Sequence, residues 1–157
     1  MNLEKYKHLA FFADFRPEDI ESLAPFFSPQ TWVAGTVVFK QGDYAEYFYL
    51  VVSGELTIRF KPHDGPVMNV ARIQPGGIFG WSAAMGNPAY TSGAVCTLDS
   101  EVLRIRGVDL RTILDKHPDL GNLITNRLSA IIAERQQAQQ RRVNTLLTDG
   151  LRQQSNN

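Results

Sequence analysis

The residues best suited to chemistry lie between positions 76 and 95, beginning with Gly76-Gly77-Ile78-Phe79-Gly80. They read as the end of a strand, a glycine-rich turn, one short helical turn, a loop and a new strand. A glycine-rich turn that opens a helix points backbone N–H groups outward, and this arrangement suits an anion. The segment therefore predicts a small binding site made of a backbone cradle and three hydroxyls, with the cradle running from Gly80 to Ala83 and the hydroxyls supplied by Ser82, Thr91 and Ser92.

Hydrophobic periodicity indicates which elements hold this segment in place. Pro17 suits the first position of a helix, whose apolar face would include Ile20, Leu23, Ala24 and Phe27. From Thr31 to Ile105 the pattern is that of short strands separated by turn residues, which favours a sandwich or barrel. The predicted strands are Thr31–Val33, Val37–Lys40, Tyr47–Val52, Glu55–Lys61, Met68–Gln74, Ser92–Thr97 and Glu101–Ile105.

Helical spacing returns after Ile105. A short helix would end near His117-Pro118, because the residue before a proline disfavours helical backbone. A long helix would follow, with an apolar stripe formed by Leu120, Leu123, Ile124, Leu128, Ile131 and Ile132. These patterns predict a single domain over 1–157, with an N-terminal helical part at 9–30, a β-roll at 31–106 and C-terminal helices at 107–151.

Five motifs occur in order at the spacing of one known family. They are Lys40-Gln41-Gly42-Asp43, Phe48 to Glu55, Pro75 to Gly80, Ala94-Val95, and Glu101 to Ile105. From about Leu9 to Leu147 the chain resembles cyclic nucleotide-binding domains, such as the sensor domain of catabolite activator proteins. The resemblance implies an α+β fold: an antiparallel β-roll of the jelly-roll type, flanked by an N-terminal helix and two C-terminal helices, the last one long.

The resemblance identifies residues 79–95 with the family's phosphate-binding cassette, F-G-E-x-A followed by R-x-A-x-V. The chain has Trp81 where the family has a ribose-binding glutamate, and Thr91 where it has a phosphate-binding arginine. Trp81 would either stack on a base or fill the pocket. Without the two charged contacts, the remaining groups suit a neutral or weakly anionic ligand. The expected ligand-binding residues of the cassette are Phe79, Gly80, Trp81, Ser82, Ala83, Thr91 and Ser92.

Two residues of the long helix complete the expected site. Aligning Pro118-Asp119 with the start of the family's long helix places Arg135 and Gln136 where that helix reaches the nucleotide base. Arg135 would then either bind the ligand or lie at the surface or between subunits. Arg72, on the strand before the cassette, is a weaker candidate for a compensating cation.

Composition and motifs exclude several other functions. The chain has 157 residues, 16 basic and 16 acidic, so its overall charge does not favour nucleic acid. Its single cysteine, Cys96, fits a reducing cytoplasm, and neither a signal peptide nor a membrane span is evident. The family's transcription factors add a DNA-binding module of about 60–80 residues after the long helix. Only ten residues follow Leu147, so we expect no direct DNA binding.

Enzymatic chemistry is not indicated by the sequence. His8, His63 and His117 fall in three different elements, which argues against a metal-dependent cupin, another common small β-roll. No nucleophile elbow, Cys–His pair or P-loop occurs. We therefore expect no catalytic residue, no metal and no certain cofactor, with a cyclic nucleotide or another small molecule as the possible ligand.

The sequence thus favours a stand-alone regulatory module that signals through its C-terminal helix. Leu128, Ile131 and Ile132 also predict a homodimer through that helix, although the polar run 133–142 weakens this prediction. Two alternatives remain, a protein-binding adaptor without a small ligand and a cupin-like metal enzyme. If the fold is a β-roll flanked by helices, we expect eight residues to be buried: Phe39, Leu50, Ile58, Phe79, Val95, Leu103, Ile124 and Leu128.

Overall fold

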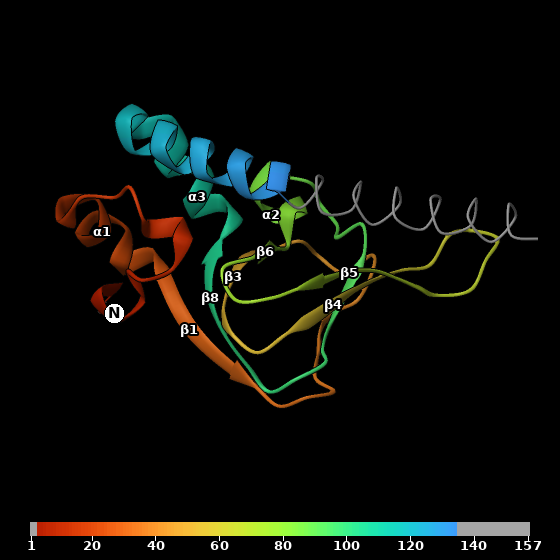
Figure 1. Ribbon diagram of the computed structural model, residues 1–157. Helices are drawn as coiled ribbons and strands as arrows, with labels where there is room; N and C mark the ends of the chain where they lie inside the picture. The colour runs from red at the N-terminus through yellow and green to blue at the C-terminus, as the bar shows by residue number, and fades with distance from the viewer. Residues whose placement is uncertain (1–2, 135–157) are drawn as a thin grey trace, which may run out of the picture. The chain divides into compact units, whose positions relative to one another are not determined.

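Two antiparallel sheets of four strands each form the body of the protein in the computed structural model, which describes residues 3–134 (Figure 1). The strand order is β1-β8-β3-β6 in one sheet and β2-β7-β4-β5 in the other. This arrangement is the β-roll that the sequence predicted. The strands are β1 (Phe27–Trp32), β2 (Val37–Phe39), β3 (Tyr47–Ser53), β4 (Leu56–Phe60), β5 (Met68–Ile73), β6 (Ile78–Phe79), β7 (Gly93–Cys96) and β8 (Ser100–Arg106).

Short helices precede and interrupt the strands. The helix α1 (Pro17–Leu23) starts at the predicted proline, and the Asp19 carboxylate accepts the Arg16 backbone N–H at 3.0 Å, which caps the helix. Helical backbone also covers residues 118–134. The remaining helices are η1 (Leu3–Tyr6), η2 (Ala10–Phe12), η3 (Ala24–Phe26), α2 (Trp81–Met85) and α3 (Gly107–Lys116).

The first strand begins earlier than predicted. Helix α1 ends at Leu23, and Phe27 lies in β1 opposite Ile105, so the prediction of Phe27 on a helical face is wrong. Pro29 lies inside this strand, opposite Leu103. A proline is tolerated there because β1 is an edge strand, where a missing N–H costs no ladder hydrogen bond. Strand β6, only two residues long, was not among the predicted strands.

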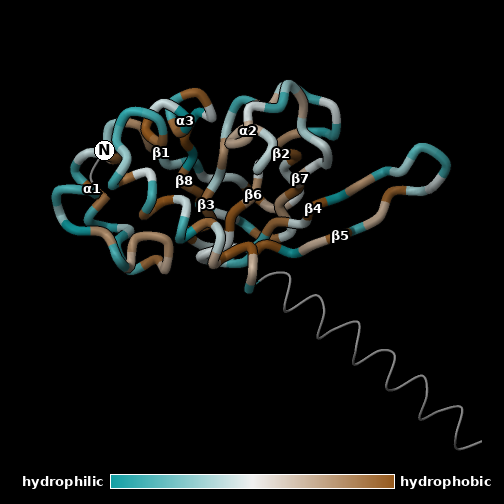
Figure 2. The backbone as a smooth tube through the Cα atoms, turned by 90° about the horizontal axis from the view of Figure 1, so that it is seen from above, coloured by the Kyte–Doolittle hydropathy of each residue, from teal (hydrophilic) through white to brown (hydrophobic). Residues whose placement is uncertain are grey.

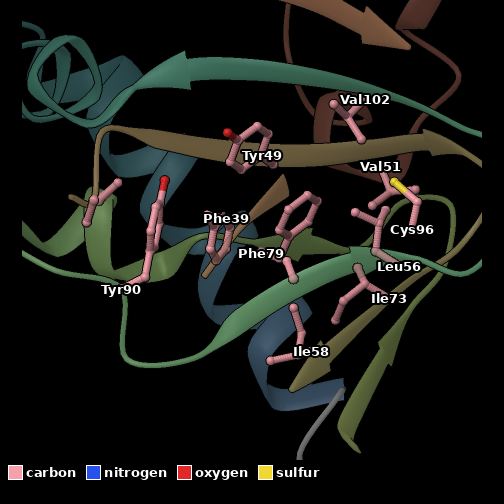
Figure 3. Packing of buried hydrophobic residues seen from close by; sticks show 13 residues of the cluster. Phe39, Tyr49, Val51, Leu56, Ile58, Ile73, Phe79, Tyr90, Cys96 and Val102 are labelled. Atoms are coloured by element: carbon pink, nitrogen blue, oxygen red, sulfur yellow. The ribbon is translucent and has the colours of Figure 1, made fainter. Parts of the chain in front are cut away.

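Strands β3 and β8 contribute buried residues to both faces of their sheet. All eight residues predicted to be buried are confirmed, none more than 7% exposed. Tyr49 and Val51 of β3 belong to a cluster that also holds residues of the second sheet, whereas Phe48 and Leu50 point to the opposite face, as strand alternation requires. The cluster, shown in Figure 3, positions the predicted site because Phe79 and Ala83 are part of it.

The chain divides into two units, residues 1–124 and 125–157. Both sheets and α1 to α3 lie in the first unit. Within it, the hairpin of β4 and β5 reaches out from the other strands (Figure 2). Among residues 3–134, no helix is both long and apolar enough to cross a membrane.

Candidate functional site

Within the cassette, Gly80 links β6 to α2. Gly80 has φ +77°, a left-handed conformation that side chains rarely adopt. A Cβ atom at this position would also lie 2.7 Å from the Tyr47 carbonyl oxygen and 3.0 Å from the Tyr49 ring. Only glycine therefore allows the turn to pack this closely against β3.

Hydrogen bonds inside α2 reduce the predicted backbone cradle. The Ala83 N–H donates to the Gly80 carbonyl at 3.1 Å, so this donor is already satisfied within the turn. At the other end of the helix, Gly86 adopts φ +80°, and the Asn87 N–H donates to the Ser82 carbonyl at 2.9 Å. The five-residue helix is thus closed at its C-terminal end by a glycine cap.

Trp81 lies outside the cluster between the sheets. Its side chain is 38% exposed and meets Phe48 edge-on, with ring centroids 6.0 Å apart. Phe48 belongs to the face of β3 opposite Tyr49, so this contact lies outside the cluster between the sheets. Trp81 supplies neither the acceptor that a ribose hydroxyl needs nor the interior packing.

The cassette carries no charge at all. Every residue from 73 to 98 is uncharged, and Thr91 is exposed while Ser92 is half-buried. Arg72 does not supply the missing positive charge. Its neighbours Ala71 and Ile73 face the cluster between the sheets, so strand alternation turns the exposed Arg72 to the other face of β5. Arg135 and Gln136 lie outside the described residues.

Stacked aromatic rings occupy the space between β2, β3 and the cassette loop (Figure 3). The rings of Phe39 and Tyr90 stack with centroids 3.6 Å apart and an interplanar angle of 14°. Tyr49 and Phe79 form a second stacked pair at 4.6 Å and 6°. Phe39 also lies beside both members of that pair, at 6.0 Å and 6.1 Å. We call Phe39, Tyr49, Phe79 and Tyr90 the aromatic cluster.

Tyr90 is the site residue that the sequence analysis missed. It is 5% exposed, its hydroxyl donates to the Tyr47 carbonyl at 2.6 Å, and the same hydroxyl accepts the Tyr47 N–H at 3.0 Å. Its backbone is also fixed, because the Tyr90 N–H donates to the Asp43 carbonyl and its carbonyl accepts the Gly42 N–H, both at 2.9 Å. The motif Lys40–Asp43 could have indicated this role, because its turn binds the backbone of Tyr90, the residue directly before Thr91.

Burial changes the acidity of the two tyrosines in the aromatic cluster. Burial raises the pKa of Tyr49 well above its ordinary value of 10, and the nearby Tyr90 adds to this rise while the positive charge of Arg104 opposes it. Burial also raises the pKa of Tyr90, although its hydrogen bond to the Tyr47 backbone acts in the opposite direction. Both phenols stay protonated at neutral pH, and the Tyr49 hydroxyl accepts a hydrogen bond from the Arg104 guanidinium.

A direct contact joins the cassette to the C-terminal helices. The Arg111 guanidinium of α3 donates to the Ala83 carbonyl of α2 at 2.5 Å, and a Cβ atom at Gly86 would lie 3.5 Å from the Arg111 side chain. At the start of α3, a Cβ atom on Gly107 would collide with the same Ala83 carbonyl. Helices α2 and α3 are therefore in contact through one arginine and one glycine.

Metal chemistry finds no support in the described part of the chain. His8, His63 and His117 are all exposed. Within residues 3–134 no three histidine, cysteine or acidic residues come together as a metal site would require. Cys96 is a buried free thiol in β7.

Comparison with known proteins places the site in context. The family model for the cyclic nucleotide-binding domain matches residues 29–117. A cyclic AMP receptor protein from Thermus thermophilus is 27% identical over 125 residues, which span 79% of this chain and 56% of that protein. The acetyltransferase Pat of Mycolicibacterium smegmatis is 36% identical over 87 residues, 55% of this chain and 26% of the enzyme.

A solved structure supports the same fold. A cyclic nucleotide-binding domain from Methylobacillus flagellatus superposes with a TM-score of 0.76 at 20% identity, covering 90% of this chain and 79% of that domain. The chain spans little more than half of the receptor protein and about a quarter of the acetyltransferase. The match to these longer proteins therefore concerns only a part of each.

Proposed function

Because the chain belongs to the cyclic nucleotide-binding domain family, we propose that it is a non-enzymatic regulatory module with an altered cassette. The ligand in this proposal is neutral or weakly anionic. The cassette passes its state to α3 and the helix that follows, and the C-terminal helix carries the signal and joins two copies of the chain.

The contact between Arg111 and the Ala83 carbonyl is the observation that carries this proposal. Any displacement of α2 must break or drag this hydrogen bond, because the Ala83 carbonyl is held by Arg111 and abuts Gly107. A ligand that prefers one position of α2 thereby changes the equilibrium position of α3. The coupling needs no charge on the ligand, which agrees with a cassette that has none.

The uncharged cassette supports the altered ligand. A charge-assisted hydrogen bond from arginine to phosphate contributes about 1.5–3 kcal/mol, which Thr91 cannot supply. At about 1.4 kcal/mol for each tenfold change in affinity, its loss weakens binding of a cyclic phosphate by about ten- to hundredfold. Uncharged ligands do not suffer this loss.

A thermal-shift screen tests the proposal. Cyclic AMP, cyclic GMP, cyclic dinucleotides and the uncharged nucleosides adenosine and guanosine are compared on the full chain. A ligand at about 100 times its dissociation constant adds about 2.7 kcal/mol to the free energy of unfolding. We expect a nucleoside or another weakly charged compound to raise the melting temperature more than the cyclic monophosphates do.

The coupling needs its own measurement. Amide hydrogen exchange of α3 is recorded with and without the compound that the screen identifies, in the native chain and in Arg111→Met. We expect the ligand to change exchange in α3 of the native chain, while the variant binds the ligand but leaves α3 unchanged. Equal responses in both proteins would exclude Arg111 as the connection.

The second candidate function is a protein-binding adaptor without a small ligand. The observation in its favour is the aromatic cluster, in which Tyr90 stacks on Phe39 and takes up the ring space of the interior. This candidate predicts that no compound in the screen stabilises the native chain. It also predicts that stability changes only when a protein partner is added.

A further inference from the structure

An arginine on β8 lies outside the cassette and has no acidic partner within residues 3–134. Arg104 lies two residues beyond Val102, a member of the cluster between the sheets, so strand alternation places both on one face of β8. Its guanidinium carbon lies 4.0 Å from the centroid of the Tyr47 ring, a cation–π contact that fixes the plane of the group. Arg104 is half-buried.

The charge of Arg104 is not neutralised by the described part of the protein. Arg106, two residues further along β8, has its Nε 3.7 Å from a Glu46 carboxylate oxygen, whereas no carboxylate within residues 3–134 forms an ion pair with Arg104. The Nε atom of Arg104 is buried, and no hydrogen-bond partner for it occurs among the described residues. The guanidinium does hydrogen-bond the Tyr49 hydroxyl, but that neutral group leaves its charge uncompensated. A half-buried cation without a counter-charge costs free energy that an incoming anion would recover.

Hydroxyl groups flank Arg104 on both neighbouring strands. Ser28 of β1 lies directly opposite it on one side, and Tyr49 of β3 lies opposite it on the other. Directly opposed residues of antiparallel strands have Cβ atoms about 4.5–5.5 Å apart, so the three side chains form a row across the sheet. Ser28 is half-buried, and this end of the row is therefore accessible from solvent.

We propose that Arg104, with the hydroxyl of Ser28, binds an oxyanion group, a phosphate or a carboxylate, of a small molecule, while Tyr49 holds the guanidinium from the interior. The guanidinium supplies a planar fork of N–H donors that matches two oxygens of such a group. The Tyr47 ring holds the fork in place and offers an apolar surface to the rest of the ligand. The site includes neither a cassette residue nor Arg111, so a test of this site does not depend on the proposed function.

Nuclear magnetic resonance of the full chain tests this site. The Arg104 Nε–H signal and the backbone amide of Ser28 are followed while phenyl phosphate, inorganic phosphate or benzoate is added at constant ionic strength. We expect both signals to shift and to saturate. Tighter binding of phenyl phosphate than of benzoate identifies a phosphate ester as the natural group, and the reverse order identifies a carboxylate.

Two variants and one control decide the outcome. Arg104→Lys keeps the charge but not the fork, and should weaken binding about tenfold, whereas Arg104→Met should weaken it about ten- to hundredfold. Arg59→Lys is the control, because Arg59 is exposed on β4 and forms no ion pair in the described part of the chain. Should Arg104→Met fail to fold, Arg104→Lys carries the test.

Three results would overturn the proposal. Shifts that stay linear to tens of millimolar would indicate nonspecific binding. An unchanged affinity in Arg104→Lys would exclude the guanidinium fork, and an equal loss in Arg59→Lys would show that any surface cation binds the probe.

Discussion

Restoring the two missing family contacts should give the cassette affinity for cyclic nucleotides. The double change is Trp81→Glu with Thr91→Arg. The structure favours it sterically, because Thr91 is exposed and Trp81 is 38% exposed, so neither replacement enters the packed interior. A glutamate in the first turn of α2 is also compatible with the positive end of a helix.

The magnitude follows from the interactions that the double variant adds and removes. An arginine–phosphate hydrogen bond adds about 1.5–3 kcal/mol, and a glutamate that accepts the ribose hydroxyl adds a similar amount, since its acceptor is charged. The loss of the Trp81–Phe48 edge contact destabilises the fold by about 0.5–1.5 kcal/mol, but it does not enter the binding free energy. We therefore expect cyclic AMP to bind the double variant at least about tenfold more tightly than the native chain.

Calorimetry with cyclic AMP and cyclic GMP measures the effect. The single variant Thr91→Arg should account for most of the gain, and Thr31→Arg, an exposed threonine of β1, is the matched control that should gain nothing. The reasoning is refuted if the double variant binds no better than Thr31→Arg. Micromolar binding of cyclic AMP by the native chain would also refute the reasoning, because another cation would then hold the phosphate.

Four further predictions concern packing, coupling, pH and assembly. Tyr90→Phe removes a buried hydroxyl that satisfies the Tyr47 N–H and carbonyl, and should lower the free energy of unfolding by about 1–3 kcal/mol in a denaturant titration. Gly107→Ala, which forces a methyl group against the Ala83 carbonyl, should lower the melting temperature by several degrees, at about 2–4 °C per kcal/mol, and alter hydrogen exchange in both α2 and α3. Stability should fall as the pH rises above about 10, because the folded state raises the pKa of Tyr49 and Tyr90 and the unfolded chain loses these protons first; a flat pH–stability profile there would contradict the burial of both phenols. Light scattering at tens of micromolar should show a dimer, and Ile131→Glu, at a half-buried position of the C-terminal helix, should convert it to a monomer.

Most of the fold was predictable because its signals are local and repeated. Turn glycines such as Gly54, with φ +86°, separate strands that each contribute apolar residues to the interior. The start of β1 was not predictable from the same rules, because Pro25 and Pro29 argue against a strand unless its edge position is known. Whether β1 lies at the edge or in the centre of its sheet depends on its pairing with β8, which is distant along the chain.

The site was harder to predict than the fold because its key contacts are between distant residues. Family motifs identified Phe79, Gly80 and Thr91 with the cassette, and in the structure Gly80 joins β6 to α2 while Thr91 precedes β7. They could not show that Trp81 turns outward to Phe48, since this depends on which face of β3 the ring meets. Nor does local pattern indicate that Arg111 reaches the Ala83 carbonyl, 28 positions earlier in the chain.

Tyr90 determines how a ligand could use the interior of the β-roll. A ring entering beside Phe39 must displace the Tyr90 ring and break two hydrogen bonds to the Tyr47 backbone. The apparent affinity of such a ligand is reduced by the fraction of molecules in which Tyr90 has already moved. The backbone of Tyr90 is bonded to residues 42 and 43, so the side chain must rotate while the loop stays in place. Ligands that bind without moving Tyr90 avoid this cost, and the small, weakly charged ligand that we propose at Thr91 and Ser92 would therefore bind more readily than a complete nucleotide.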